Sequence, residues 1–255
     1  MSGPINRPWV LVTGAAQRLG RAVALAAGAH GWNVIAHYNA SRAPAESLVA
    51  ELRALGADAH AVGADLADPA AASALADAAR AHAGAAMTGL VNCAAIFEHD
   101  LATDFTPAAF ERHMRINAMA PALLAQTFAA ALPADARGAI VNFLDFKLAQ
   151  PYPDHFTYTL SKYALAGATE MLARALAPRI RVNAVAPGYA LPSPGQAPAD
   201  FERLHAQTPL ERGATPDDIA AATLFLLEAE AVTGQTIYVD AGLRFRTRDR
   251  DLAFS

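Results

Sequence analysis

Short apolar runs alternate with longer Ala- and Leu-rich stretches along most of this 255-residue chain. The short runs have the length and composition of strands and span Trp9 to Thr13, Asn33 to His37, Ala59 to Gly63, Gly89 to Asn92, Ala139 to Leu144, Arg181 to Ala186 and Thr236 to Val239. The longer stretches have helical periodicity and span Arg18 to His30, Arg42 to Leu55, Pro69 to Ala83, Pro107 to Leu132, Phe156 to Ala177 and Pro216 to Leu227. Uniformly apolar strands that alternate with helices are typical of a parallel sheet covered on both faces. The pattern predicts an α/β protein with a Rossmann-like, doubly wound sheet of about seven strands in a three-layer α/β/α sandwich.

Three of the predicted helices share one start signal, a polar residue followed by proline. The pairs are Asp68-Pro69, Thr106-Pro107 and Thr215-Pro216. Asp and Thr side chains cap the free N–H groups of a first turn, and proline is tolerated there because it has no N–H to satisfy. We expect these helices to begin at the three prolines.

One segment interrupts the alternation late in the chain. Leu191 to Pro209 is rich in proline and polar residues and is too long for an ordinary connection. We interpret it as a loop insertion that closes over a substrate. No composition shift or internal repeat marks a second unit, so the sequence predicts a single domain over residues 1–255, with an N-terminal tail at 1–8 and a C-terminal tail at 244–255.

Charge and composition exclude several classes of protein. A formal net charge of −4 and a pI near 6.0 give no basic face for nucleic acid, and aspartates dilute the one basic cluster, Arg244 to Arg250. The single cysteine, Cys93, excludes a disulfide framework and a cysteine-based zinc site, and no metal site is predicted. No apolar run approaches the roughly 20 residues of a membrane span, and Met1 to Pro8 lacks the apolar block of a secretory signal. We expect a cytoplasmic protein with no nucleic-acid or membrane partner.

The first predicted strand is followed by Thr13-Gly14-Ala15-Ala16-Gln17-Arg18-Leu19-Gly20, which leads directly into a helix. Small residues before a helix N-terminus let backbone N–H groups and the positive end of the helix dipole approach a pyrophosphate. Two glycines are fewer than the usual dinucleotide fingerprint has, so a plain tight turn is the alternative. Arg18 favours a phosphate site, because a cation at a helix start opposes the dipole unless an anion lies nearby. We expect cofactor contacts from Gly14, Gln17, Arg18, Leu19 and Gly20.

The second predicted strand ends in His37-Tyr38-Asn39-Ala40-Ser41-Arg42, a run without a carboxylate. NAD-selective sites usually place an acid here to bind the ribose 2′-hydroxyl. Its absence leaves nothing to repel a 2′-phosphate, so the sequence predicts NADP(H), bound by His37, Tyr38, Asn39, Ser41 and Arg42. A polar helix cap with Ser41 at the N-cap is compatible with this prediction. Asp65 and Leu66, after the third strand, complete the predicted cofactor site at the adenine.

Tyr158 and Lys162 form a Tyr-x-x-x-Lys motif in the predicted helix Phe156 to Ala177. Residues four apart lie on one helix face. The pKa of a free tyrosine, about 10, is too high for ready proton exchange at neutral pH, and a neighbouring ammonium lowers it. Among the 20 basic residues only Lys147 and Lys162 are lysines, so a lysine at this position favours catalysis over chance.

With the glycine turn, the polar run after the second strand and the Tyr-x-x-x-Lys motif, the chain resembles the short-chain dehydrogenase/reductase family over essentially its full length. The matching segments occur in the family's order: Thr13-Gly14 to Gly20, Asp65, Asn92-Cys93-Ala94-Ala95, Asn117, Tyr158 with Lys162, and Pro187-Gly188. The resemblance implies that Tyr158 is the general acid/base, that Lys162 lowers its pKa and holds the nicotinamide ribose, and that Asn117 supports a proton-relay water. It also implies a homotetramer and further cofactor contacts from Asn92, Ala94, Pro187, Gly188 and Tyr189.

Two departures from the family pattern narrow the resemblance. Most members have Ser about 13 residues before the tyrosine, where this chain has Asp145. A carboxylate donates a hydrogen bond only when protonated, so it is a poor partner for a ketone oxygen and a good one for a Tyr hydroxyl or a ring N–H. The second departure is Arg18, which replaces the middle glycine of the fingerprint.

Both changes are similar to those of pteridine reductases and dihydromonapterin/dihydrofolate reductases. The His37-Tyr38-x-x-Ser41 run agrees with them, and Phe97 matches the aromatic residue that stacks on the pterin there. Cys93, Ala95 and Ile96 depart from that pattern.

The predicted chemistry is reduction of a C=N bond. A hydride goes from NADPH to a ring carbon, while Tyr158, polarised by Asp145 and Lys162, supplies a proton to the adjacent ring nitrogen. The predicted substrate contacts are Arg18, Phe97, Asp145, Tyr158 and Tyr189. The alternatives are a core aromatic at Phe97 and a salt bridge from Asp145 to Lys147 or an arginine. Lys147 itself is interpreted as a surface or channel-rim charge.

Three functions therefore compete. The first is an NADPH-dependent reductase of a dihydropterin, dihydromonapterin or dihydrofolate. The second is a carbonyl reductase of a 3-oxoacyl thioester or sugar ketone, which Asp145 disfavours. The third is a catalytically silent NADP-binding regulatory protein, which the intact set of Tyr158, Lys162 and Asn117 disfavours.

Overall fold

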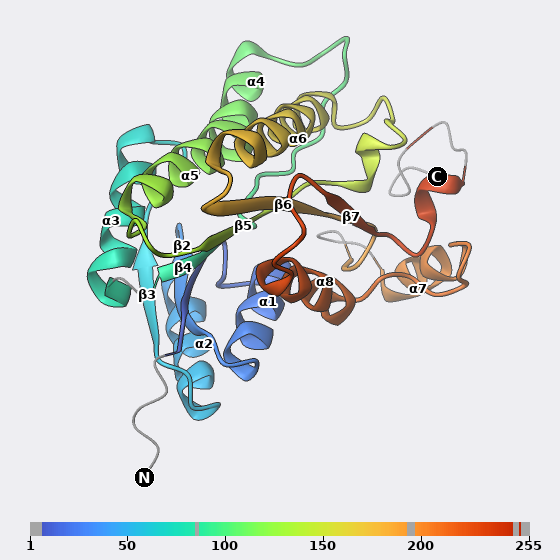
Figure 1. The fold of residues 1–255 in the computed structure, drawn as a ribbon. Coiled ribbons are helices and arrows are strands. Elements are labelled where there is room, and N and C mark those ends of the chain that lie inside the picture. The colour runs from blue at the N-terminus through green and yellow to red at the C-terminus, as the bar shows by residue number, and fades with distance from the viewer. Residues whose placement is uncertain (1–6, 85–86, 193–196, 247–249, 251–255) are drawn as a thin grey trace.

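The computed structural model describes residues 7–84, 87–192, 197–246 and 250, and a parallel sheet forms its centre (Figure 1). The strands are β1 (Trp9–Val12), β2 (Asn33–Tyr38), β3 (Ala59–Gly63), β4 (Met87–Asn92), β5 (Gly138–Phe143), β6 (Ile180–Pro187) and β7 (Thr236–Val239). They lie in the order β3-β2-β1-β4-β5-β6-β7, and each neighbouring pair is parallel. The direction of winding reverses between β1 and β4, which leaves a crevice at their carboxyl ends. The predicted fold class is confirmed.

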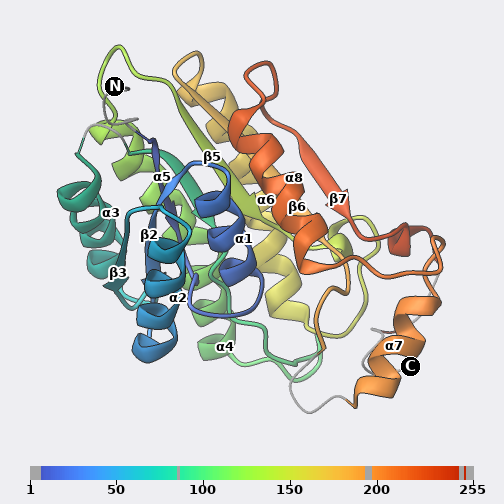
Figure 2. The same cartoon turned by 90° about the horizontal axis from the view of Figure 1, so that it is seen from below.

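Helices cover both faces of the sheet (Figures 1 and 2). One face carries α1 (Arg18–Ala29), α2 (Arg42–Ala54) and α8 (Pro216–Glu228), and the other carries α3 (Pro69–Ala83), α4 (Pro107–Met114), α5 (Ala120–Ala131) and α6 (Phe156–Leu176). The remaining helical segments are α7 (Pro198–Ala206) and the short turns η2 (Arg115–Met119), η3 (Phe146–Leu148) and η4 (Leu243–Phe245). Within the described parts of the chain, no helix is long and apolar enough to cross a bilayer.

The five central strands are almost entirely buried, whereas the edge strands β3 and β7 are partly exposed. Burial on both faces explains why the central strands have continuous apolar runs. Val10 and Val12 belong to the apolar cluster that includes side chains of α1, α2 and α8. Leu11, between them, belongs to the cluster that includes side chains of α3, α5 and α6. Successive side chains of a strand point to opposite faces, so a central strand needs an apolar residue at every position.

The three predicted start signals form caps in the structure. The Asp68 carboxylate accepts a hydrogen bond from the Ala70 N–H at 2.9 Å. The Thr106 hydroxyl accepts from the Ala109 N–H at 3.1 Å. Thr215 and Asp218 form a reciprocal capping box. These helices begin at the predicted prolines.

The predicted helix Pro107 to Leu132 is interrupted in the structure. Its middle, Arg115–Met119, is a π-helical turn between α4 and α5. The turn contains the fully buried Asn117, whose amide pairs with both backbone groups of Ile96, at 2.9 and 3.0 Å. A π turn re-aims side chains within a helix that is otherwise continuous, and periodicity alone does not reveal it.

The predicted loop 191–209 was wrong in part, because it contains α7. A proline at the first helical position, here Pro198, is compatible with a helix. Leu204 of α7 is buried in a small apolar cluster with Phe146, Tyr152 and Leu243, and this tertiary contact favours the helix. Residues 193–196 of the segment lie outside the described residues, as do most of the two predicted tails, at 1–6, 247–249 and 251–255.

Candidate active site

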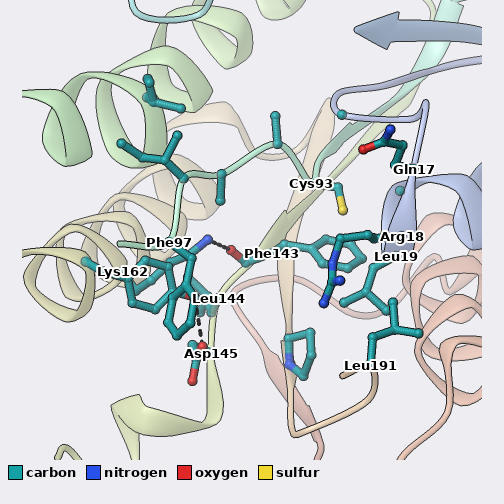
Figure 3. A pocket seen from close by; sticks show the side chains of 18 of the residues that line it. Gln17, Arg18, Leu19, Cys93, Phe97, Phe143, Leu144, Asp145, Lys162 and Leu191 are labelled. Atoms are coloured by element: carbon teal, nitrogen blue, oxygen red, sulfur yellow. Dashed lines mark hydrogen bonds between the residues drawn. The ribbon is translucent and has the colours of Figure 1, made fainter. Parts of the chain in front are cut away.

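A cavity of about 570 Å³ lies at the carboxyl ends of β1, β4, β5 and β6. Of the residues that sequence reasoning assigned to the site, those that line it are Gly14, Gln17, Arg18, Leu19, Gly20, His37, Asn39, Asp65, Leu66, Ala94, Phe97, Asp145, Tyr158, Lys162, Pro187, Gly188 and Tyr189. The others, Tyr38, Ser41, Arg42, Asn92 and Asn117, stand outside this lining. Figure 3 shows two opposed walls, with Gln17, Arg18, Leu19 and Leu191 on one side and Phe97, Asp145 and Lys162 on the other.

The turn after β1 brings backbone unusually close to backbone. A Cβ added at Gly20 would lie 2.3 Å from the Gly14 carbonyl oxygen, and one at Gly14 would lie 3.0 Å from the Cα of Ala94. Gly14 also has a φ of +65°, which favours glycine. The turn therefore presents bare backbone at the N-terminus of α1, the geometry that holds a pyrophosphate. The residues present fit a dinucleotide.

Arg18 occupies a strained position in the same turn. Its φ of +52° lies in the left-handed region, which costs a non-glycine residue roughly 1–2 kcal/mol. Its exposed guanidinium donates to the Pro192 carbonyl at 3.1 Å, in the segment that follows Leu191 on the same wall of the cavity. A charged side chain at this cost fits the predicted contact with an anionic cofactor and substrate better than a plain turn does.

His37 holds the turn after β1 in place through hydrogen bonds. Its Nδ1 accepts from the Gly14 N–H at 3.1 Å, which leaves the Nε2 proton to donate to the Ala64 carbonyl at 3.0 Å. Burial lowers the pKa of His37, and the bond to Ala64 opposes this. With both ring nitrogens occupied, a neutral His37 supports the phosphate turn rather than offering a charge to a 2′-phosphate.

Three of the residues that the sequence predicts to bind a 2′-phosphate come after β2, and one of them, Arg42, lies 3.6 Å from the Glu46 carboxylate. Asn39 is exposed and lines the cavity. Ser41 stands at the N-cap of α2 but makes no capping hydrogen bond with its side chain. Arg42 is largely exposed, with its guanidinium 5.7 Å from the centre of the Tyr38 ring.

Asn92 lies below the cavity rather than in its lining. Its buried amide donates to the Asn142 side chain at 2.8 Å, and Asn142 donates in turn to the Thr169 hydroxyl at 2.9 Å. The predicted cofactor contact of Asn92 stays a prediction. The chain just after it is held by Thr13, whose hydroxyl accepts from the N–H groups of Cys93 and Ala94, both at 3.0 Å.

Tyr158, Asp145 and Lys162 meet at the end of β5. The Tyr158 hydroxyl donates to Asp145 Oδ2 at 2.7 Å, and Lys162 Nζ donates to the Phe143 carbonyl at 2.7 Å (Figure 3). The second carboxylate oxygen, Oδ1, accepts from the backbone N–H of Lys147 at 2.9 Å, which fixes the carboxylate plane. Tyr158 and Lys162 lie on one face of α6, as their spacing predicted, and Asp145 meets them from the end of β5.

Burial perturbs the ionisable groups around this centre. It lowers the pKa of Lys162 to about 8, while the charges of Asp145 and Cys93 oppose the change. It also raises the pKa of the Cys93 thiol to about 12, with Lys162 opposing. At neutral pH, Lys162 is therefore an ammonium and Cys93 an uncharged thiol.

Asn117 lies behind the cavity wall. Besides holding Ile96, its amide donates to the Ser161 hydroxyl at 3.0 Å. It therefore connects the loop after β4 with the helix that carries Tyr158. The relay role implied by the resemblance stays a prediction.

Phe97 lines the cavity and packs against two other rings, those of His155 and Tyr158. It is 46% exposed, so the alternative of a core aromatic is wrong. Its ring stacks on His155 with centroids 3.9 Å apart and meets Tyr158 edge-on at 4.7 Å. Sequence reasoning missed His155, which has a φ of +59° before α6 and a ring nitrogen 2.9 Å from the Glu98 carbonyl. No local motif points to it.

The sequence predicted a surface or channel-rim position for Lys147, and the structure excludes the surface position. This residue is only 3% exposed, lines the cavity, and places Nζ 4.7 Å from the centre of the Phe97 ring. The cause is η3, a tight turn that begins at Asp145 and carries Lys147 inward. The scarcity of lysine was the one signal that could have found it.

Tyr189 connects the cavity to the segment after β6. It lines the cavity, and its ring lies 5.4 Å from that of Phe201 in α7. The Tyr189 carbonyl lies 2.5 Å from Nε2 of His205, also in α7. The helix found in the predicted substrate loop thus packs directly against a cavity residue.

Known proteins resemble this chain over nearly its whole length. Residues 14–244 match the family model described as enoyl-(acyl carrier protein) reductase. An uncharacterized oxidoreductase of Methylorubrum extorquens is 35% identical over 242 residues, covering 92% of this chain and 96% of that protein. A 3-oxoacyl-(acyl-carrier-protein) reductase of Staphylococcus aureus is 33% identical over 238 residues, with 91% and 96% covered.

Solved structures give a second comparison. The alternative dihydrofolate reductase 1 of Brucella canis, complexed with NADP, superposes with a TM-score of 0.91 at 37% identity, covering 96% of each chain. The Brucella suis protein, also with NADP, gives 0.88 at 35% identity, with 95% and 98% covered. An angucycline C-6 ketoreductase with bound NADP gives 0.86 at 30% identity, with 94% and 96% covered.

Proposed function

The chain belongs to the short-chain dehydrogenase/reductase family and is an oxidoreductase, and we propose that it uses NADPH to reduce a C=N bond of a dihydropterin, dihydromonapterin or dihydrofolate. NADP in all three solved neighbours supports this cofactor, as does the absence of a carboxylate from the run that follows β2.

The hydrogen bond from Tyr158 to Asp145 carries the proposal. A serine in that place donates to a ketone oxygen, whereas an ionised carboxylate repels one. The same carboxylate accepts readily from an N–H of a heteroaromatic ring, and it already orients the Tyr158 hydroxyl at 2.7 Å. A substrate rich in ring N–H groups matches this wall better than a simple ketone.

NADPH, when bound, supplies the hydride. Tyr158 then holds the proton that the ring nitrogen next to the reduced carbon receives, and Asp145 keeps its hydroxyl in position. Lys162, charged below its pKa of about 8, stabilises the phenolate that proton transfer leaves. Phe97, stacked on His155 and half exposed, offers a face for a flat ring.

Arg18 and Tyr189 complete the proposed substrate contacts. Arg18 stands on the opposite wall and reaches the cavity mouth, where it faces both phosphate and substrate. Tyr189 closes the cavity from the segment after β6. We also propose a cytoplasmic homotetramer. For the assembly, the support is a groove on α4 and η2 that Phe110, Met114 and Met119 line together with Glu111 and Arg115.

A ketone reductase is the second candidate, and the relatives favour it. The Staphylococcus aureus relative and the angucycline ketoreductase neighbour are named for carbonyl reduction. A silent NADP-binding protein is the third, and the paired Tyr158 and Lys162 speak against it.

An assay of substrate turnover distinguishes the three candidate functions. Purified protein with NADPH is assayed for loss of absorbance at 340 nm with dihydrobiopterin, dihydrofolate and a 3-oxoacyl thioester. We expect consumption with a pterin or folate and at most slow consumption with the thioester. Turnover of the thioester alone would overturn the proposal in favour of the ketone reductase, and tight NADPH binding without any turnover would favour the silent protein.

A further inference from the structure

The helix that carries Tyr158 is capped from a distant part of the chain. His155, the residue before α6, has a φ of +59° and makes no capping hydrogen bond with its side chain. Asp100, in the loop after β4, supplies the cap instead. Its carbonyl accepts from the Phe156 N–H at 3.1 Å, and its Oδ1 accepts from the Thr157 N–H at 3.0 Å. One residue, 57 positions before Thr157, therefore satisfies two of the free N–H groups with which α6 begins.

Asp100 differs from the caps of α3, α4 and α8. Asp68, Thr106 and Thr215 each stand directly before the helix that they cap. Asp100 is only 8% exposed and belongs to another segment, so it joins two parts of the chain. Its carboxylate also complements the positive end of the helix dipole.

A buried chain of hydrogen bonds continues from Asp100 to α4. The Thr157 hydroxyl donates to Asp100 Oδ2. His113 of α4 places Nδ1 2.9 Å from this hydroxyl and 3.0 Å from the Ala109 carbonyl. Because the hydroxyl proton goes to Asp100 and a carbonyl only accepts, Nδ1 carries a proton and donates to both oxygens. Thr157 and His113 are fully buried, so bulk water does not replace a partner that is lost here.

The contacts of Asp100 bring two functional side chains together. Phe97, which lines the cavity, comes three positions before Asp100, and Tyr158 lies in the first turn of α6, next to the residue that Asp100 caps. The two rings meet edge-on with centroids 4.7 Å apart. Asn117 holds the same loop through both backbone groups of Ile96. The loop is thus held on both sides of Phe97.

We propose that Asp100 is a positioning residue, which holds the Phe97 ring and the Tyr158 hydroxyl in the relative arrangement that the reaction needs. The inference rests on the proposed function in taking Phe97 as the face that receives a flat substrate and Tyr158 as the proton donor. A displacement of about 1 Å between reacting groups lowers a rate as much as about a hundredfold. Asp100 stands outside the cavity lining and acts through these two side chains.

The first test follows the Phe97 ring without a substrate. Ligand-free protein labelled with 4-fluorophenylalanine contains 11 fluorinated rings, and Phe97→Leu identifies the resonance of interest. In Asp100→Ala we expect this ¹⁹F resonance to shift and broaden, because the loop is no longer fastened to α6 beside the ring. Asp68→Ala is the matched control. It also removes a carboxylate that accepts from the second residue of a helix, here Ala70 of α3, and it should leave the Phe97 resonance unchanged.

The second test measures the reaction, with whichever substrate the turnover assay identifies. Asp100→Ala should lower kcat about tenfold and leave the KM for NADPH within about twofold, because the β1–α1 turn is untouched. Asp100→Asn keeps an acceptor oxygen for the Thr157 N–H and offers an N–H to the Thr157 hydroxyl, so kcat should return to within about threefold of the wild type. Asp68→Ala should lower the melting temperature without lowering kcat.

An unchanged Phe97 resonance or an unchanged kcat in Asp100→Ala would overturn the inference. If that variant does not fold, Asp100→Ala/Thr157→Val replaces it, because the double variant removes both members of a buried pair and leaves His113 its bond to the Ala109 carbonyl. The same shift of the resonance and the same loss in kcat are expected there, and wild-type values would contradict the proposal. If no substrate is turned over, the proposed function fails, whereas the ¹⁹F measurement still decides this inference because no substrate enters it.

Discussion

The two walls of the cavity are built on different principles. The wall of the β1–α1 turn, called the backbone wall below, carries Gln17, Arg18 and Leu19 on a turn in which Gly14 and Gly20 approach closely and a neutral His37 lies beneath. The wall at the end of β5 consists of charged side chains packed together, with Asp145, Lys147 and Lys162 around Tyr158. The first wall suits a ligand group that any family member binds, and the second adapts this chain to its own chemistry.

The charged wall costs stability. The pKa of Lys162 falls from 10.5 to about 8 because burial removes water from the ammonium. Each pKa unit corresponds to about 1.4 kcal/mol, so the charged form is disfavoured by roughly 3 kcal/mol at neutral pH. The backbone wall carries a smaller cost, about 1–2 kcal/mol for the left-handed Arg18.

The largest effect is expected from Asp145→Ser on the charged wall. It removes the charge that orients Tyr158 and binds ring N–H groups, so pterin turnover should fall by about two to three orders of magnitude. NADPH affinity should stay within twofold, because the opposite wall is untouched.

Asp65→Ser serves as the matched control, because Asp65 lines the same cavity and is the residue predicted to contact the adenine. It should weaken NADPH binding and leave kcat nearly unchanged. Steady-state kinetics and fluorescence titration measure both variants, and normal pterin turnover in Asp145→Ser would remove Asp145 from the mechanism.

Lys162→Met should unfold less readily than the wild type. Between pH 8 and 10.5 the unfolded state holds a proton on this lysine that the folded state has lost, so wild-type stability rises with pH in that window. At pH 7 the wild type carries the full penalty. At pH 7 the free energy of unfolding of the variant should therefore exceed that of the wild type by about 2 kcal/mol. This value allows for loss of the hydrogen bond from Lys162 to the Phe143 carbonyl. The difference between variant and wild type should be smaller at pH 10.

Urea unfolding at pH 7 and pH 10 measures this difference. Arg174→Met on the same helix is the control, since that side chain is 79% exposed and should change stability by less than about 0.5 kcal/mol. A Lys162→Met protein less stable than the wild type at pH 7 would show that the buried charge is not the dominant cost.

The smallest effect is expected from Asn39→Asp on the backbone wall. A carboxylate at this exposed lining position would repel a 2′-phosphate and shift the preference from NADPH toward NADH about tenfold. Ala50→Asp adds the same charge to an exposed position of α2 outside the cavity lining and should leave the preference unchanged. The measurement is the ratio of kcat/KM for NADPH to that for NADH in each variant. The same ratio in Asn39→Asp and Ala50→Asp would show that the 2′-phosphate does not bind near Asn39.

The sequence predicted the backbone wall better than the charged wall. Strands buried on both faces leave a strong signal as continuous apolar runs, and the predicted strand ends agree with the structure to within two residues. The turn with Gly14 and Gly20 is local, so its motif could be recognised directly.

The charged wall depends on contacts between distant segments. Lys147 faces inward only because η3 turns it over Phe97, which lies 50 positions earlier in the chain. The stack of His155 on Phe97 likewise joins two loops that no spacing rule connects. The sequence did not predict α7 because this helix also depends on contacts between distant segments: its Leu204 is buried against residues from three other segments. Sequence motifs and periodicity do not reveal such positions, because tertiary packing between distant segments determines them.

The most direct test of the central claim is a competition between two substrates in one reaction. With limiting NADPH, equal concentrations of dihydrobiopterin and a 3-oxoacyl thioester compete for the enzyme, and the product ratio equals the ratio of their kcat/KM values. We predict at least about a hundredfold preference for the pterin, and its collapse in Asp145→Ser. A preference for the thioester in the wild type would contradict the account.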